Sequence, residues 1–297
     1  MKGELTFKTE LKNINKSFLS LVKNKLHKKN YKEKLKINGE NIFILKFNAS
    51  DKDIAFKKFQ IDVNTIILSK LHITDQVYLI INSPGGSVTA YADAAQQIVR
   101  LKNEGFKVTC FIDEVAASGG YMMAAVCDEI ISQPFAFVGS IGVVAQVPIV
   151  EDLLKKYGIQ FKVYTAGTKK RSVVPTKTPE PEEEEFFKEK LKDIHTAFKK
   201  HVLKYRPQIN EEKLMDGDYY MAQDVINEKV VDKIGDSQSS LIKAFKEGYN
   251  LIEVITTTKK KSNGILSLFG VDSAIENILS KYIDKAIESS NPNDIFK

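Results

Sequence analysis

Two glycine-rich segments, each after a predicted strand, contain the groups that acyl transfer requires. Residues 82–86 (NSPGG) place two glycines where a backbone amide can point outward and a ligand can approach closely. Residues 116–121 (AASGGY) place Ser118 among small residues at a strand-to-helix junction. The amides of Gly86 and Gly119 could then stabilise an oxyanion beside the Ser118 hydroxyl. Each segment alone is also compatible with a tight turn or with close packing.

A serine nucleophile needs a base, and the histidines offer little support for one. None of the four lies in a loop beside the glycine-rich segments, so we interpret them as surface residues, although a triad with distant partners stays open. Their positions are His27, His72, His195 and His201.

A lysine is the alternative base, because burial of an ammonium group lowers its pKa toward the working range. Residues 165–171 (TAGTKKR) follow a predicted strand and could enter an apolar site. We choose Lys170 as the base, with Lys169 as the neighbour that could replace it. Residues 139–142 (GSIG) supply Ser140, whose hydroxyl could orient the neutral amine.

Charge and composition exclude several other functions. The 297 residues are 43% apolar, which is sufficient for a folded core. Residues 1–40 contain 11 Lys and 4 Glu, so the net charge of this segment alone exceeds the net charge of +6 of the whole chain. Only three of the 44 basic residues are arginine, so sequence-specific nucleic-acid binding is not expected. No phosphate-binding loop is present, and Cys110 and Cys127 read as buried thiols rather than a disulfide or zinc site.

Alternating strands and helices must position these groups. We expect strands over 41–47, 76–82, 106–112 and 161–165, and helices over 51–72, 87–104 and 149–157. Residues 176–186 are expected to form an acidic loop and helix start, followed by a long helix that runs to about Tyr205. This alternation predicts an α/β fold with a largely parallel sheet. Residues 1–40 are predicted to form a basic arm with an amphipathic helix over 11–26, and residues 236–297 a helical extension. The arm could contact anionic lipid, or could be a solvated segment.

Taken together, the segments NSPGG, AASGGYMMA, VGSIGVVAQ and TAGTKKR, in this order, resemble the signal peptide peptidase family of serine-lysine peptidases. The similarity is greatest to its SohB branch and covers about residues 41–235, the expected catalytic domain. It implies the ClpP/crotonase fold of stacked βαβ units. It also implies Ser118 as nucleophile, Lys170 as general base, Gly86 and Gly119 as oxyanion donors and Ser140 as the partner of the lysine.

The resemblance also implies partners and a location. The substrates would be apolar peptides, such as signal peptide remnants, or unfolded proteins, cleaved without a cofactor or metal. Relatives form homo-oligomeric rings whose neighbours complete the substrate grooves. Relatives also begin with a membrane-spanning helix, so we expect a shortened form of a bacterial inner-membrane protein with a periplasmic catalytic domain.

Two features of this sequence depart from the family pattern and keep other functions open. Lys169 stands where relatives usually carry an aromatic residue, and no 18-residue apolar stretch is present. The alternatives are a catalytically degenerate membrane-associated scaffold of the same fold and, less favoured, a crotonase-type enzyme acting on acyl-CoA.

Overall fold

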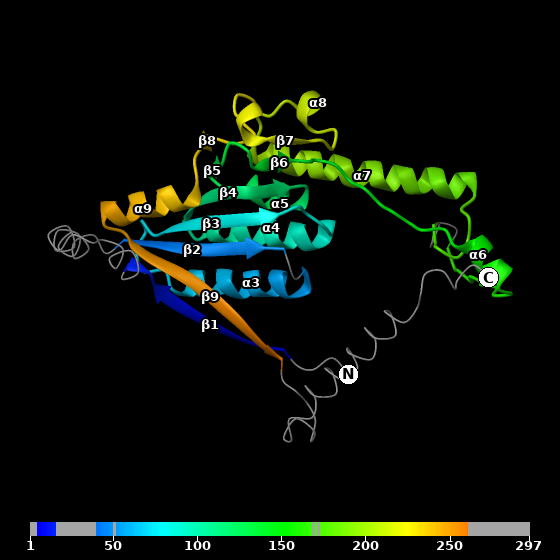
Figure 1. Ribbon diagram of the computed structural model, residues 1–297, viewed down its shortest axis with the longest axis horizontal. Helices are drawn as coiled ribbons and strands as arrows, with labels where there is room; N and C mark the ends of the chain where they lie inside the picture. The colour runs from blue at the N-terminus through cyan, green and yellow to red at the C-terminus, as the bar shows by residue number, and fades with distance from the viewer. Residues whose placement is uncertain (1–4, 16–39, 50–51, 168–169, 171–172, 261–297) are drawn as a thin grey trace, which may run out of the picture. The chain divides into compact units, whose positions relative to one another are not determined.

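The computed structural model describes residues 5–15, 40–49, 52–167, 170 and 173–260. Its largest element is a nine-stranded sheet in the order β1-β9-β2-β3-β4-β5-β8, to which β6 is added beside β4 and β7 beside β6 (Figure 1). The strands are β1 (Leu5–Asn13), β2 (Asn41–Asn48), β3 (Gln76–Ser83), β4 (Lys107–Ala117), β5 (Glu129–Ser132), β6 (Phe137–Gly139), β7 (Tyr219–Met221), β8 (Lys233–Ile234) and β9 (Asn250–Lys260).

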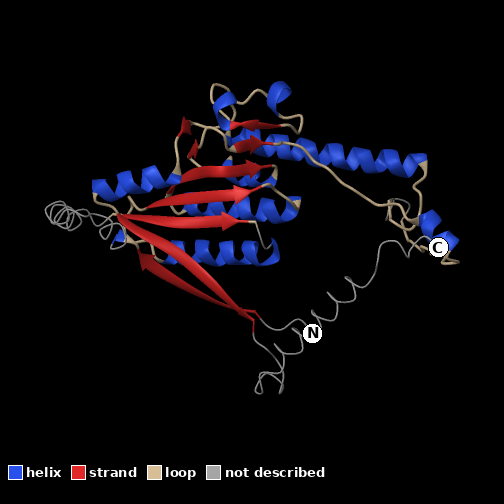
Figure 2. Cartoon of the chain, viewed as in Figure 1, coloured by secondary structure: helices blue, strands red, loops and turns tan. Residues whose placement is uncertain are grey.

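Helices alternate with the strands along the chain (Figure 2). They are α3 (Lys52–Leu68), α4 (Val88–Asn103), α5 (Gly119–Ala124), α6 (Glu151–Lys156), α7 (Pro181–Tyr205), α8 (Glu211–Leu214), the 3-10 helix η1 (Ala222–Asp224) and α9 (Ser237–Glu247). Strand pairs β2–β3, β3–β4, β4–β5, β4–β6, β5–β8 and β2–β9 are parallel, and β6–β7 is antiparallel. The predicted α/β class with a largely parallel sheet is therefore confirmed.

Strand β2 shows why the sheet is covered on both faces. Its side chains alternate, as strand geometry requires, so that Phe43, Leu45 and Phe47 enter one apolar cluster while Ile42 and Ile44 enter another. The first cluster includes residues of α3, α4 and α5, and the second includes residues of α9. Burial on both faces is the pattern expected for a parallel strand.

A proline and a capping box mark the start of helix α7. Pro181 occupies the first helical position, and Glu180 and Glu183 form a reciprocal capping box in which the Glu180 amide donates to Glu183 Oε2 at 2.9 Å. Only Phe198 and Val202 of this helix are buried. The N-terminal part of α7 therefore extends beyond the sheet (Figure 1).

Three expectations from the sequence differ from the structure. Residues 11–13 belong to strand β1, because residues 5–11 alternate with period two, and most of the helix predicted over 11–26 lies outside the described residues. Residues 161–165 form no strand, since strand-favouring side chains without a pairing partner do not make a ladder. The region after residue 236 contains α9, as expected, but also strand β9, which pairs with β2.

The compact unit of the chain comprises Thr9–Ile255, and the two chain ends form a second unit. The proposed boundaries at residues 40 and 235 stay predictions. Within the described residues, no helix combines the length and the apolar character that crossing a bilayer would need. Cys110 and Cys127 are both buried and free, as predicted, and burial together with contact to Cys127 raises the pKa of the Cys110 thiol well above its ordinary value.

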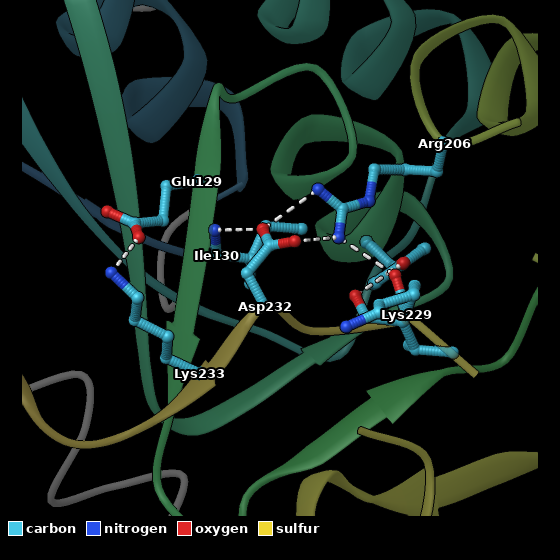
Figure 3. A network of polar contacts seen from close by, with 8 residues as sticks. Glu129, Ile130, Arg206, Lys229, Asp232 and Lys233 are labelled. Carbon is cyan, nitrogen blue, oxygen red and sulfur yellow. Dashed lines mark hydrogen bonds and ion pairs between the residues drawn. The ribbon is translucent and has the colours of Figure 1, made fainter. Parts of the chain in front are cut away.

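A buried ion pair joins the end of α7 to the sheet. Arg206 is 4% exposed, and its two terminal nitrogens donate to the Asp232 carboxylate at 2.9 and 2.8 Å (Figure 3). The same carboxylate accepts the Ile130 amide of β5 at 2.8 Å, and Arg206 also donates to the Lys229 carbonyl. The pair of Arg206 and Asp232 thus links a helix end, a loop and strand β5.

Candidate active site

Ser118 occupies an uncommon backbone conformation between β4 and α5. Its φ of 51° and ψ of −119° lie in a region that residues with a side chain rarely adopt. The conformation is held by neighbours, because the Ser118 amide donates to the Gly139 carbonyl at 2.8 Å and the Met122 amide donates to the Ser118 carbonyl at 2.9 Å. A sharp strand-to-helix turn of this kind presents a serine hydroxyl for nucleophilic attack.

Gly85 lies directly against this turn. Its φ is +98°, and a β-carbon there would lie 2.7 Å from the Ser118 Cβ and 2.8 Å from the Gly119 amide nitrogen. Such distances leave no space for a side chain. The sequence therefore needs glycine at this position both for conformation and for the approach of the two segments.

Gly86 and Gly119 carry the two amides that sequence analysis proposes as oxyanion donors. Among the described residues, neither amide has a protein acceptor. Gly86 and Ser118 line one cavity of about 550 Å³, and Gly119 follows Ser118 at the first position of α5. The site thus combines a hydroxyl with two backbone donors that have no protein acceptor, which is the set that acyl transfer to serine requires.

Ser140 lines the same cavity as Ser118. Like Ser118 it has a positive φ, 52°, and it follows β6, the strand that pairs with β4. Its hydroxyl donates to the Gly217 carbonyl at 3.2 Å, and its amide donates to the Asp218 carbonyl at 2.7 Å. These bonds fix the Ser140 loop against the segment that precedes β7.

His195 is a residue of this cavity that sequence reasoning assigned to the surface. It is partly buried on α7, and its Nε2 lies 2.8 Å from the Ile141 carbonyl oxygen and 2.9 Å from that of Met215. Because carbonyls only accept hydrogen bonds, Nε2 must carry the proton. The helical position of His195 gave no signal of this, since the segments that it joins are distant in sequence.

Lys170 lies elsewhere in the described part of the chain. It is exposed and lines a second cavity, of about 590 Å³, with Phe161, Val163, Tyr164 and Pro175 among its neighbours, and Ser118 is not one of the lining residues. The structure therefore brings together Ser118, Gly86, Gly119 and Ser140 but not the proposed base. Lys169, the alternative base, lies outside the described residues.

Known protein families and proteins match most of the chain in sequence. The sequence profile described as peptidase family S49 matches residues 100–251, and the profile of the S49 N-terminal region matches residues 1–98. The probable protease SohB of Haemophilus influenzae is 39% identical over 222 residues, which are 74% of this chain and 62% of that protein. The probable protease SohB of Buchnera aphidicola subsp. Acyrthosiphon pisum is 36% identical over 228 residues, 76% of this chain and 67% of the relative. The chain thus spans less than two thirds of the length of the first relative.

Proposed function

Because this chain belongs to peptidase family S49, in the branch of the SohB proteases, we propose that it is a serine endopeptidase with Ser118 as its nucleophile. Family membership confirms the resemblance drawn from the sequence and is consistent with a ClpP/crotonase-like α/β fold. One observation carries the proposal. Ser118 is held in an uncommon conformation at a cavity that Gly86 also lines, and the amides of Gly86 and Gly119 have no acceptor among the described residues.

The mechanism follows from these groups. An extended peptide places its carbonyl over Ser118, whose oxygen attacks while its proton passes to a neutral lysine amine. The Gly86 and Gly119 amides stabilise the negative charge that develops on the carbonyl oxygen. The protonated lysine then gives its proton to the leaving amine, and water activated by the same amine releases the acyl group from Ser118.

Two side chains compete for the role of base. His195 lines the Ser118 cavity, but its Nε2 carries a proton that faces two backbone carbonyls, so this atom cannot accept the serine proton. We keep Lys170 as the base because the resemblance to serine-lysine peptidases implies it, and Ser140, which lines the Ser118 cavity, as the residue that orients it.

Ser118 and Lys170 line separate cavities of one chain, so the proposed mechanism needs an arrangement that brings them together. The segment that leads to Lys170 exposes large apolar side chains, namely Val144, Leu153, Tyr157, Phe161 and Tyr164, each 57 to 87% exposed. Exposed apolar surface of this extent is typical of an interaction site. We propose a homo-oligomer in which this segment packs on a second copy and places Lys170 beside the neighbour's Ser118.

The proposed substrates are apolar peptides, such as signal peptide remnants, or unfolded proteins at the bacterial inner membrane. The catalytic domain would lie on the periplasmic side, attached through an N-terminal anchor. The apolar members of the Ser118 cavity, Val88, Val143 and Val144, suit such side chains.

Turnover of an unfolded protein tests the nucleophile. We expect Ser118→Ala to abolish hydrolysis, because no other group in the mechanism attacks the carbonyl. Ser87→Ala is the matched control, since it removes an exposed hydroxyl that contacts Thr89 and lies one residue after Gly86. Hydrolysis that survives Ser118→Ala would refute the proposal, and a wild-type chain without activity would favour the scaffold function.

Mixing two inactive variants tests the assembly. If Lys170 acts on a neighbour's Ser118, then co-refolded Ser118→Ala and Lys170→Ala chains regain part of the wild-type activity, because some sites combine an intact serine with an intact lysine. If both residues act within one chain, every site keeps one defect. Absence of recovery in a mixed oligomer would therefore refute the shared site.

A further inference from the structure

Tyr91, on helix α4, contacts the backbone of both proposed oxyanion residues. A β-carbon on Gly119 would lie 2.4 Å from the Tyr91 Cγ, and one on Gly86 would lie 3.2 Å from its Cε2. The ring is 2% exposed and packs edge-on against Phe47 and Phe56, with ring centroids 5.9 and 4.9 Å away. The buried Tyr91 ring is thus a rigid surface against which Gly86 and Gly119 pack.

The Tyr91 hydroxyl completes a closed circuit of hydrogen bonds with the 82–86 loop. It donates to the Gly85 carbonyl at 3.1 Å, and it lies 2.5 Å from the Ser83 hydroxyl oxygen. The Gly85 amide in turn donates to Ser83 Oγ at 3.2 Å. Since Tyr91 gives its proton to Gly85, Ser83 must donate to Tyr91, and every proton of the circuit is used.

This circuit sets the direction of the Gly86 amide. The described peptide bonds are trans, so the N–H of Gly86 points opposite to the carbonyl of Gly85 within one peptide plane. The Gly85 carbonyl points to the buried Tyr91 hydroxyl. The Gly86 N–H must therefore point away from the interior, toward the cavity that holds Ser118. Burial also raises the pKa of Tyr91, which keeps its hydroxyl a donor.

We propose that Tyr91 is a positioning residue that fixes both oxyanion amides, the Gly86 amide through the Gly85 carbonyl and the Gly119 amide through ring contact. The inference rests on the proposed function of these amides. Tyr91 does not touch the substrate carbonyl itself. It acts on the transition state because the direction of a donor matters most where charge develops.

The test compares Tyr91→Phe with Tyr121→Phe. Tyr121 is equally buried, and its hydroxyl donates to the Val230 carbonyl at 2.8 Å, so both variants lose a buried tyrosine hydroxyl that donates to a backbone carbonyl. We expect Tyr91→Phe alone to lower kcat, by about tenfold or more, with KM changed less than about twofold. Ser83→Ala, which opens the same circuit from its other side, should lower kcat by a smaller factor because Tyr91 can still donate to Gly85.

Amide hydrogen exchange over residues 83–88 gives a second readout that does not depend on turnover. We expect faster exchange in Tyr91→Phe than in wild type or Tyr121→Phe, because Gly85 loses its fixed carbonyl. Equal kcat in the two phenylalanine variants, or unchanged exchange in Tyr91→Phe, would overturn the inference. A wild-type chain without peptidase activity would instead refute the proposed function, and the exchange comparison would still decide whether Tyr91 holds the loop.

Discussion

Gly85 and Ser118 come so close that a β-carbon on Gly85 would lie 2.7 Å from the Ser118 Cβ. Two segments that lie more than thirty residues apart in sequence thereby line one cavity, the candidate active site. The contact depends on the absence of a side chain at Gly85. The position of the proposed nucleophile is consequently coupled to the loop that carries the proposed oxyanion amide of Gly86.

Gly85→Ala should inactivate the protein and destabilise it, because the added methyl group must displace Ser118 or Gly119. Gly158→Ala separates this clash from backbone strain, since Gly158 also has a positive φ, +72°, but nothing lies within 4 Å of the added carbon. We expect Gly158→Ala to cost about 1 kcal/mol, whereas Gly85→Ala costs more and abolishes activity. Urea unfolding and peptide hydrolysis measure both effects, and equal losses in the two variants would contradict the account.

The strained backbone at Ser118 predicts that the protein loses stability by keeping a residue with a side chain at this position, where the proposed mechanism needs the hydroxyl. Ser118→Gly and Ser118→Ala both remove the hydroxyl and should both be inactive. Only glycine adopts a φ of 51° and ψ of −119° without strain, so Ser118→Gly should be more stable than Ser118→Ala by about 1 kcal/mol. Thermal unfolding of the two variants checks this order. An alanine variant as stable as the glycine variant would mean that the turn is not strained.

The ion pair of Arg206 and Asp232 should contribute far more to stability than the neighbouring pair of Lys233 and Glu129 (Figure 3). Asp232→Ala leaves a buried guanidinium unpaired, at a cost of about 3 kcal/mol or more. Lys233→Ala removes an exposed pair and should cost less than about 1 kcal/mol. Denaturant unfolding of both variants measures the difference, and similar values would show that Arg206 finds other partners.

His201 should make the folded protein less stable in mild acid. Burial, with repulsion from Lys204, lowers its pKa below the ordinary 6.5, so the unfolded chain binds more protons between the folded pKa and that value. The contribution of neutral His201 to the free energy of unfolding is fully present above pH 6.5. It is lost as the pH falls through the pKa of His201 in the folded protein. The free energy of unfolding should therefore fall more for wild type than for His201→Gln between about pH 8 and 5.

His72→Gln, at an exposed position, is the control for this comparison. It should retain the pH dependence of wild type. If His201→Gln loses stability in acid as steeply as wild type does, the buried imidazole is not the group responsible.

The sequence predicts those parts of the fold that repeat a regular pattern. The alternation of apolar strands with helices of 3.6-residue period predicts the parallel sheet, and the acidic, proline-containing residues 176–186 predict a helix start in the region where α7 begins. Ser118 and Gly86 could be proposed because a serine at a strand-to-helix junction and paired glycines after a strand suit a nucleophile and an oxyanion donor, although each segment alone also suits a turn or close packing. In each case a few neighbouring residues carry the signal.

Features that depend on contacts between distant segments could not be predicted. Tyr91 is one apolar position on an amphipathic helix, and its contact with Gly119 exists only in the folded chain. His195 likewise joins Ile141 to Met215 across the fold. Residues 161–165 were mistaken for a strand because composition does not reveal whether a pairing partner is present.

The most direct test of the serine-lysine mechanism is the pH dependence of kcat/KM for an unfolded protein substrate, in wild type, Lys170→Ala and Lys162→Ala. Lys162 lines the same cavity as Lys170 and is the matched control. Since the base must be neutral, activity of wild type and Lys162→Ala should rise between about pH 6 and 10, whereas Lys170→Ala should be inactive throughout. Activity of Lys170→Ala with an unchanged pH profile would contradict the account and assign the proton transfer to another group.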